Sequence, residues 1–381
     1  MKMTPDNEVR DVILMQEEEG HLFKMCYQCG TCTGTCPWNL VKDFSVRKIM
    51  RKSQLGFIDF SEEDIWQCAA CGACVSRCPR GVEIIDVFKG FRRVIVEMGV
   101  AKVPDSLRLS VKNISYLGNP MGEPAEKRDN WMKSCGVGEF TPEMEYLYFP
   151  CCVPAYDAKV RRMAVSLVKI LNQAGVSFGA LGKKEKCCGE SVRKAGNEDM
   201  FMSLARSNLE AFAGVRKVIV TSPHCYHTFK NEYPDLGADF EVIHYTQILD
   251  RLIRDGRVTL TKRVKAKVIY HDPCFLGRHN HEYESPRRVL QAIPGVELIE
   301  FPDNRQNSIC CGGGGGRVWM ETPAGERFSE LKVAQAIDLD ADVLAVACPY
   351  CMLLFDDAIL AMGKEDVLKV KDISELVLQG I

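Results

Sequence analysis

The spacing of the cysteines constrains this chain more than any other feature of its sequence. Two runs in the first hundred residues share one spacing, with a proline after the fourth cysteine: Cys26, Cys29, Cys32, Cys36 and Pro37, then Cys68, Cys71, Cys74, Cys78 and Pro79. A disulfide framework would suit a small exported protein, whereas this chain has 381 residues and is acidic through Glu19, where a secretory signal would be basic and then apolar. The odd total of 19 cysteines and their tight clustering favour metal binding.

Both runs have the spacing of bacterial ferredoxins that carry two 4Fe-4S clusters. In that pattern three closely spaced thiolates bind one cluster, and the fourth cysteine, before the proline, binds the other. We therefore predict two cubane 4Fe-4S clusters, the first held by Cys26, Cys29, Cys32 and Cys78 and the second by Cys36, Cys68, Cys71 and Cys74. Zinc is disfavoured, because a structural zinc site of this kind takes pairs of Cys-x2-Cys ligands rather than three evenly stepped cysteines.

Helix signals accompany these two runs. Ser45 is a candidate N-cap for a short helix that ends before Gly56, and apolar residues at helical spacing over 84–98 end at Gly99. The spacing predicts a helical, ferredoxin-like two-cluster domain over residues 1–100.

Residues 101–145 are predicted to be a linker. Hydrophobic periodicity is weak there, and Gly, Pro and charged residues are frequent. We expect burial of Tyr116 and Trp131 to hold the linker in place. Cys135 matches no ligand spacing and is expected to be an inert thiol.

The rest of the chain is an internal repeat in which three cysteine motifs recur in the same order. The first copy contains Cys151-Cys152, Cys187-Cys188-Gly189 and Ser222-Pro223-His224-Cys225, and the second contains Pro273-Cys274, Cys310-Cys311-Gly312 and Cys348-Pro349-Tyr350-Cys351.

The motifs of the repeat lie at the ends of predicted strands. These hydrophobic strands are residues 146–149, 218–221, 267–270 and 343–347, and helical patterns lie between them. Strands that alternate with helices predict a largely parallel sheet with ligands at its carboxyl ends. The expected fold class is therefore α+β and α/β, with the two-cluster domain followed by two homologous α/β half-domains at 146–260 and 261–381.

These motifs together resemble the cysteine-rich CCG-domain iron–sulfur proteins, whose type member is the catalytic subunit of heterodisulfide reductase. Residues 1–100 resemble the small ferredoxin-like subunit of that enzyme and residues from about 145 resemble the catalytic subunit, so the chain resembles a fusion of the two. The resemblance implies a noncubane 4Fe-4S cluster with five thiolates, which is the expected catalytic centre. The second repeat supplies all five thiolates: Cys274, Cys310, Cys311, Cys348 and Cys351.

The first repeat departs from this pattern at Ser222, where a cysteine is expected. Its motif cysteines are Cys152, Cys187, Cys188 and Cys225. The alternatives are an ordinary cubane 4Fe-4S cluster, a site with the Ser222 oxygen as a ligand, and no cluster; the preference of iron–sulfur clusters for thiolate favours the cubane. Cys151 stands where the family usually has a glycine. It is either a spare ligand or a buried bystander, and the bystander is expected.

Two further features lie beside the predicted ligands. The glycines at 312–316 contain a Gly-x-Gly, but no strand precedes them as a dinucleotide site requires, so we expect them to give backbone N–H groups close access to cluster sulfurs. His224 and His271 are candidate proton donors for thiol products.

The resemblance implies an oxidoreductase subunit that passes electrons from the ferredoxin-type clusters to the noncubane site, which reduces a small-molecule or protein disulfide or a related acceptor. The alternative is a non-catalytic electron conduit in a flavin-dependent, quinone-linked dehydrogenase complex, because the same repeats also resemble such subunits. No flavin or nicotinamide motif is recognisable. An electron donor is therefore expected, either a flavoprotein like the large subunit of heterodisulfide reductase or a membrane cytochrome.

Charge and hydropathy narrow the remaining partners. The formal net charge of -2 arises from acidic and basic residues mixed along the chain, so nucleic acid is not an expected partner. No uninterrupted apolar run is long enough to cross a bilayer. We expect a cytoplasmic protein that reaches a membrane only through a partner.

Overall fold

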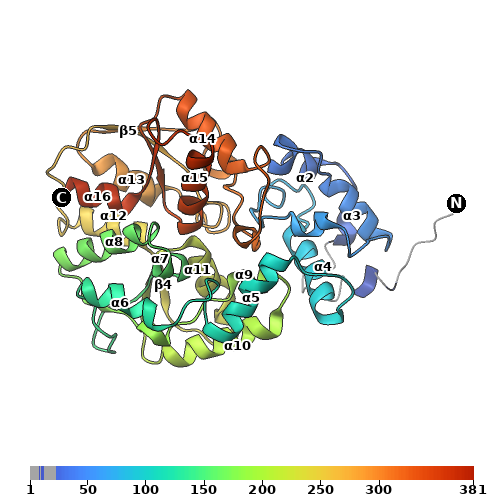
Figure 1. Cartoon of the computed structure of the whole chain (residues 1–381), viewed down its shortest axis with the longest axis horizontal. Coiled ribbons are helices and arrows are strands. Elements are labelled where there is room, and N and C mark those ends of the chain that lie inside the picture. The colour runs from blue at the N-terminus through green and yellow to red at the C-terminus, as the bar shows by residue number, and fades with distance from the viewer. Residues whose placement is uncertain (1–7, 9, 13–22) are drawn as a thin grey trace. The chain divides into compact units, whose positions relative to one another are not determined.

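The computed structural model describes residues 8, 10–12 and 23–381 (Figure 1). These residues form two compact units. Unit 1 contains the described residues up to Leu109 together with Ser191–Phe201 and Gly312–Phe328. Unit 2 contains Ser110–Glu190, Met202–Cys311 and Ser329–Ile381. Each Cys-Cys-Gly motif is thus followed in the chain by a segment that folds with the N-terminal region.

Unit 1 is built from short helices around the two cysteine runs. Its elements are α2 (Thr31–Gly34), η2 (Pro37–Leu40), α3 (Val46–Gln54), η3 (Glu63–Trp66), α4 (Ile84–Met98) and η8 (Arg317–Trp319). Ser45 caps α3 as predicted, since its hydroxyl accepts a hydrogen bond from the Lys48 backbone N–H. The helix predicted over 84–98 is confirmed as α4, which Gly99 ends in a left-handed conformation.

Arg92, on α4, ties three segments of unit 1 together. The residue is 2% exposed, and its guanidinium donates hydrogen bonds to the backbone carbonyls of Ile65, Cys68, Lys194 and Gly315 at 2.8–3.1 Å. These carbonyls belong to the region of the second cysteine run and to the segments that follow each Cys-Cys-Gly motif. Hydrogen bonds from a buried cation are stronger than neutral ones, so one side chain fixes all three segments.

Two glycines make this close packing in unit 1 feasible. A Cβ atom at Gly315 would lie 2.4 Å from the carbonyl oxygen of Cys68, and one at Gly196 would lie 2.3 Å from the carbonyl carbon of Arg92. Both residues have positive φ angles, 63° and 90°. Gly315 belongs to the glycine run that was expected to let the backbone approach cluster sulfurs closely. In the structure it allows close approach to the backbone of Cys68, a predicted cluster ligand.

Loss of the Arg92 side chain should destabilise unit 1. Arg92→Ala leaves several buried carbonyls without a donor, so we expect the free energy of unfolding to fall by about 3 kcal/mol. Anaerobic denaturant titration measures this change. Arg108→Ala is the control, because the Arg108–Asp105 ion pair is exposed and its loss should leave the midpoint unchanged. An Arg92→Ala midpoint equal to that of the wild type would contradict this account.

Unit 2 contains two four-stranded parallel sheets with equivalent strand orders. The first has the order β2-β1-β3-β4 and the second β6-β5-β7-β8. The strands are β1 (Tyr146–Phe149), β2 (Phe178–Gly179), β3 (Lys217–Val220), β4 (Glu241–His244), β5 (Ala266–Tyr270), β6 (Val296–Ile299), β7 (Val343–Val346) and β8 (Lys369–Asp372). The four strands predicted from the sequence are confirmed as β1, β3, β5 and β7, with ends shifted by one residue in places. The predicted pair of α/β half-domains is likewise confirmed.

Helices follow the strands of both sheets. The first repeat has α7 (Cys152–Tyr156), α8 (Arg161–Gln173), η4 (Gly182–Lys184), α9 (Glu190–Lys194), α10 (Glu198–Ala211), α11 (Pro223–His227), the π-helix η5 (Thr228–Glu232), η6 (Pro234–Leu236) and α12 (Tyr245–Arg254). The second has α13 (Glu284–Ala292), η7 (Arg305–Asn307), α14 (Phe328–Asp338), α15 (Pro349–Ala361) and α16 (Ile373–Gly380). Contacts between the repeats are reciprocal: α8 packs on α16, and α12 packs on α13.

The predicted linker contains two helices, α5 (Asp105–Leu117) and α6 (Glu126–Ser134), which its weak periodicity did not predict. Trp131 is buried, as expected. The expectation for Tyr116 was wrong, because its side chain is 76% exposed. Leu107 and Ile114 occupy the buried face of α5, and a residue two positions after Ile114 points to the opposite face of a helix.

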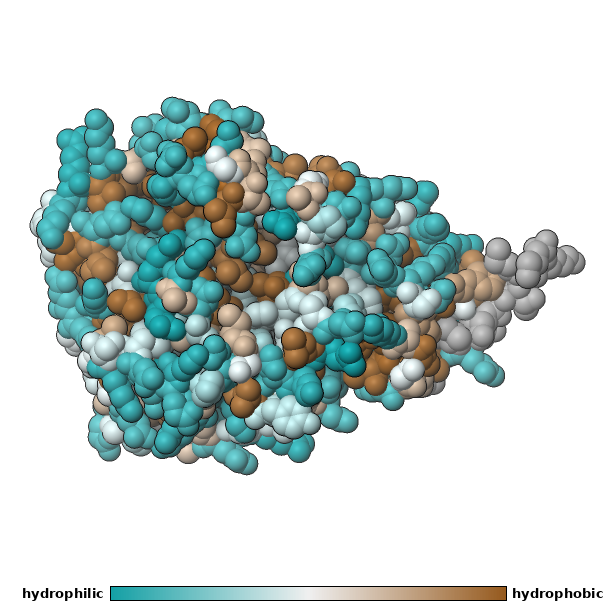
Figure 2. Space-filling view, in the orientation of Figure 1, coloured by the Kyte–Doolittle hydropathy of each residue, from teal (hydrophilic) through white to brown (hydrophobic). Residues whose placement is uncertain are grey.

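The face of the chain drawn in Figure 2 is mainly polar. Figure 2 shows hydrophilic side chains over most of the visible face, with smaller apolar patches between them. Among the described residues no helix is both long and apolar enough to cross a membrane.

Candidate iron–sulfur sites

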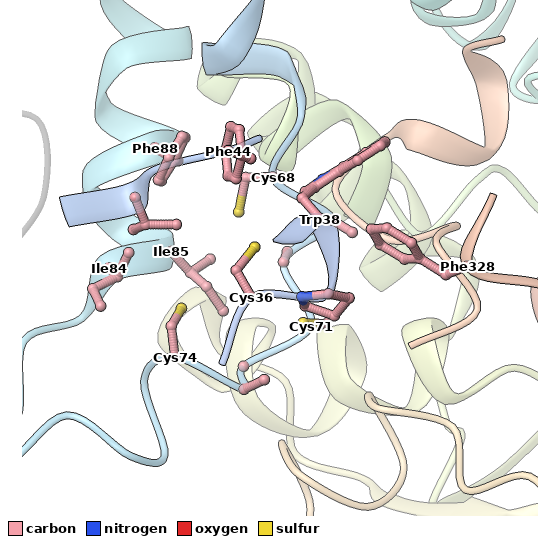
Figure 3. Close-up of a pocket in the computed structure, with 16 residues that line it drawn as sticks. Cys36, Trp38, Phe44, Cys68, Cys71, Cys74, Ile84, Ile85, Phe88 and Phe328 are labelled. Atoms are coloured by element: carbon pink, nitrogen blue, oxygen red, sulfur yellow. The ribbon is translucent and has the colours of Figure 1, made fainter. Parts of the chain in front are cut away.

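The first candidate site is an apolar pocket in unit 1 that four cysteines line: Cys36, Cys68, Cys71 and Cys74. Figure 3 shows Trp38, Phe44, Phe88 and Phe328 around them, with cysteine sulfurs directed toward the same space. Cys36 comes from the first run and the other three from the second, so the structure gathers the set predicted for one cubane cluster. The set of donors is soft sulfur, which fits an iron–sulfur cluster.

Burial also suits this pocket to a metal cluster. It raises the pKa of the Cys74 thiol well above its usual value, and the neighbouring Cys68 and Cys71 thiols raise it further. Burial similarly raises the pKa of Cys36. Thiolates in such a place need nearby positive charge, which coordinated iron supplies, because coordination deprotonates a thiol.

The second candidate site is a pocket in unit 1 lined by the other predicted set: Cys26, Cys29, Cys32 and Cys78. Cys29 is exposed, so this site lies nearer the surface than the first. The side chain of Gln28 donates a hydrogen bond to the sulfur of Cys26 at 3.5 Å, and the Val82 backbone N–H donates to the sulfur of Cys78 at 3.4 Å. Hydrogen bonds to ligand sulfurs tune the reduction potential of a bound cluster.

The exchange of the fourth cysteine between the two runs can be tested. We predict that Cys78→Ser disturbs the cluster of the first run and spares the other, although Cys78 lies in the second run. Cys36→Ser should have the reciprocal effect. Each variant should lose up to about four irons per chain, measured by iron analysis and by paramagnetic resonance of the reduced protein. Loss of the second-run cluster in Cys78→Ser would refute this pairing.

The third candidate site lies in the second repeat, at the carboxyl ends of parallel strands. Cys274 follows β5, the Cys310-Cys311 pair follows β6, Cys348 occupies the N-cap position of α15 and Cys351 lies in its first turn. All five sulfurs are buried. The Cys274 and Cys310 sulfurs are 3.9 Å apart, and those of Cys311 and Cys351 are 3.3 Å apart. The structure therefore brings together all five residues predicted for the noncubane cluster.

Two histidines contact the sulfurs of this third site. His271 directly follows β5, and one of its ring nitrogens lies within 4.8 Å of the Cys311 and Cys351 sulfurs in one buried group. Hydrogen bonds from Cys310 and Cys351, and then the nearby His271 ring, hold the pKa of Cys311 well below its usual value. Burial opposes ionisation of Cys348, yet hydrogen bonds from Cys351 and His224 lower its pKa to about 6.

His224 reaches this site from the other repeat. The sequence places His224 beside Cys225, whereas its ring contacts Cys348 of the second repeat. It stacks on Phe275 with ring centroids 4.0 Å apart, and its Nδ1 lies 3.3 Å from a carboxylate oxygen of Glu190. Sequence reasoning missed Glu190 and Phe275; the available signals were that Glu190 directly follows Cys-Cys-Gly and that Phe275 directly follows Cys274.

The fourth candidate site lies in the first repeat and gathers its four motif cysteines: Cys152, Cys187, Cys188 and Cys225. The thiols lie close enough to interact electrostatically, Cys152 with Cys187, Cys187 with Cys188, and Cys188 with Cys225. Arg128, from the predicted linker, donates to the Cys152 sulfur at 3.3 Å and forms a buried ion pair of 2.8 Å with Glu185. Sequence reasoning gave no role to Arg128.

Ser222 has a structural role in the fourth site. Its buried hydroxyl accepts a hydrogen bond of 3.2 Å from the His224 backbone N–H and so caps α11.

Ser222→Ala should lower the free energy of unfolding by about 1 kcal/mol, the usual cost of a lost N-cap. Iron content should stay at the wild-type value, because the hydroxyl of Ser222 caps α11 and is not expected to bind iron. A marked loss of iron in this variant would instead establish oxygen ligation.

Comparisons with known proteins agree with these sites. Residues 146–230 and 268–356 match the cysteine-rich CCG domain, and residues 25–83 match a 4Fe-4S dicluster domain. A crystal structure of a hypothetical protein from Helicobacter pylori has a similar fold, with a TM-score of 0.55 and 10% identity over 97% of this chain and 76% of that one.

Three relatives illustrate the range of the similarity. The probable iron-sulfur-binding oxidoreductase FadF of Bacillus subtilis is 36% identical and the EtfAB:quinone oxidoreductase of Syntrophomonas wolfei is 38% identical, each over 84% of this chain. The chain spans about half of both relatives, 47% of their length. One subunit of the dihydromethanophenazine:CoB–CoM heterodisulfide reductase of Methanosarcina barkeri is 28% identical, over 100% of this chain and 98% of the relative.

The matched domains account for every cysteine of the four candidate sites, and the relatives that are similar over most of this chain include named oxidoreductases. The chain therefore belongs to the iron–sulfur proteins that join a 4Fe-4S dicluster domain to two cysteine-rich CCG domains, and it is related to one subunit of heterodisulfide reductase and to iron–sulfur oxidoreductases.

Proposed function

We propose that this chain is an oxidoreductase subunit that takes up electrons in its ferredoxin-like domain and reduces a disulfide or a related acceptor at the second repeat. Bound 4Fe-4S clusters would supply the one-electron chemistry. The observation that carries the proposal is the buried group of five thiols in the second repeat. Two histidines lie beside these thiols, His271 near Cys311 and His224 near Cys348. The cysteines predicted to hold the noncubane cluster are Cys274, Cys310, Cys311, Cys348 and Cys351.

His224 suits this reaction because reduction of a disulfide to two thiols consumes two protons as well as two electrons. Burial lowers the pKa of His271, which disfavours a charged ring at that position. Burial disfavours a charged His224 ring, but Glu190 and then Cys348 raise its pKa well above the usual value. His224 therefore holds a proton next to the Cys348 sulfur. Phe275 and Tyr350 flank the ring and exclude water from it.

The energetics favour the proposed direction. Ferredoxin-type clusters near −400 mV and a disulfide couple near −200 mV differ by enough to release about 9 kcal/mol for two electrons. The donor is an unidentified partner, for which we propose a flavoprotein or a membrane cytochrome. A probable membrane-anchored ferredoxin of Chromohalobacter salexigens, 30% identical over 94% of this chain, supports association with a membrane through further segments or partners.

A second candidate function is an electron conduit without its own catalytic site, within a flavin-dependent, quinone-linked complex. The higher identity of the EtfAB:quinone oxidoreductase and FadF relatives favours it. The full-length match to the heterodisulfide reductase relative and the complete set of five cysteines in the second repeat favour the reductase.

A substitution in the third site separates these two functions. In anaerobic assays with reduced viologen as donor, Cys311→Ser should abolish reduction of the CoB–CoM heterodisulfide or of another disulfide that the wild type accepts. The paramagnetic signals of the ferredoxin-type clusters should remain, because their predicted ligands are unchanged. Cys135→Ser is the matched control, since Cys135 lies outside the four sites.

The outcomes of this assay discriminate clearly. Disulfide reduction that survives in Cys311→Ser would exclude the second repeat as the catalytic site and favour the conduit. The purified wild-type chain should use viologen but not NADH or NADPH, because an electron-donating partner is required in the proposal. Rapid NADH-dependent turnover by the pure chain would contradict that requirement.

A further inference from the structure

The thiols of each repeat form an ordered series of neighbours. In the second repeat, side-chain hydrogen bonds and sulfur contacts link the five cysteines in the order Cys274, Cys310, Cys311, Cys351 and Cys348. In the first repeat, five cysteine thiols likewise lie close enough for each to interact electrostatically with the next, in the order Cys152, Cys187, Cys188, Cys225 and Cys151. The first four members correspond one to one between the repeats.

The fifth member differs in its origin. In the second repeat it is Cys348, which occupies the N-cap position of α15 after β7 without a side-chain capping hydrogen bond. The corresponding residue of the first repeat, Ser222, has no thiol, and its hydroxyl is engaged in capping α11. The neighbour of Cys225 is instead Cys151, which follows β1 and is also close enough to Cys188 for their charges to interact. Cys151 thus occupies the place in the series that Cys348 occupies in the other repeat.

The backbone of Cys151 supports a functional role for its side chain. Cys151 has φ 71° and ψ 160°, a region that residues other than glycine rarely adopt. The side chain is 4% exposed. The equivalent residue of the second repeat, Pro273, is confined to negative φ and carries no ligand atom. A strained cysteine in contact with a predicted ligand is better explained by metal binding than by packing.

We propose that Cys151 supplies the fifth thiolate of an iron–sulfur cluster in the first repeat, in place of the thiol that Ser222 lacks. Both repeats then hold five-thiolate sites, and the first site is not a four-thiolate cubane. The proposal rests on a cluster in the first repeat, but it does not depend on which acceptor the chain reduces. Ligation exchanges the S–H bond of Cys151 for a sulfur–iron bond, and the proton leaves to solvent.

The decisive variant is Cys151→Gly in the full chain, purified anaerobically. Glycine adopts φ 71° without strain, so the fold should be at least as stable as that of the wild type. Iron should nevertheless fall by up to about four atoms per chain, or the Mössbauer spectrum of the first-repeat cluster should change. Cys135→Ala is the matched control and should keep the wild-type iron content and spectrum.

A rescue variant distinguishes ligation from a packing effect. Cys151→Gly combined with Ser222→Cys places the thiol at the position equivalent to Cys348, so iron content and the Mössbauer spectrum should return toward the wild type. Wild-type iron and spectrum in Cys151→Gly alone would overturn the proposal. The proposal would also be overturned if the iron content of the wild-type protein accounted for the two ferredoxin-type clusters and only one cluster in the repeats. That result would leave the proposed reductase activity intact. Conversely, disulfide reduction that survives Cys311→Ser would refute the reductase function without affecting the result at Cys151.

Discussion

The buried guanidinium of Arg92 is the interaction on which the rest of unit 1 depends. It donates to the carbonyls of Cys68, Lys194 and Gly315, which come from three segments far apart in the chain. A buried guanidinium is stable only when its N–H groups have hydrogen-bond acceptors, which these carbonyls provide. The carbonyls in turn need the donors that Arg92 supplies. The ferredoxin-like unit is therefore not made by the N-terminal hundred residues alone, because segments that follow both Cys-Cys-Gly motifs complete it.

The two repeats of unit 2 share a fold but have diverged at the sites that matter for chemistry. Equivalent strand orders and reciprocal helix contacts place the cysteine motifs of both repeats at the carboxyl ends of their sheets. His224 and Tyr350 occupy equivalent positions, and their rings lie 4.4 Å apart. His224, however, also contacts the predicted ligand Cys348. One repeat thus places an ionisable side chain at the site of the other, which favours different roles for the two sites.

These features bear on the choice between reductase and conduit. A conduit needs clusters, whereas a disulfide reductase also needs protons at the reacting sulfurs. The pairing of Glu190 with His224 beside Cys348 meets that second need. The His271 ring, with a nitrogen within 4.8 Å of the Cys311 sulfur, adds a second polar group at the same site. This is the physical reason why we favour the reductase, although the more identical relatives include a quinone oxidoreductase.

The sequence by itself determined the local features of this protein. The cysteine spacing predicted which residues line each ferredoxin-type pocket, because ligands three residues apart can reach one cluster whatever surrounds them. The Ser45 cap, the Gly99 end of α4 and the four central strands followed from short-range patterns. The tertiary structure alone decided that Cys151 neighbours Cys225, that His224 contacts Cys348 and that Gly315 packs against Cys68. Each of those contacts joins residues far apart in the chain, so it depends on how the parallel strands, the two repeats or the segments of unit 1 pack together, and no local pattern encodes that packing.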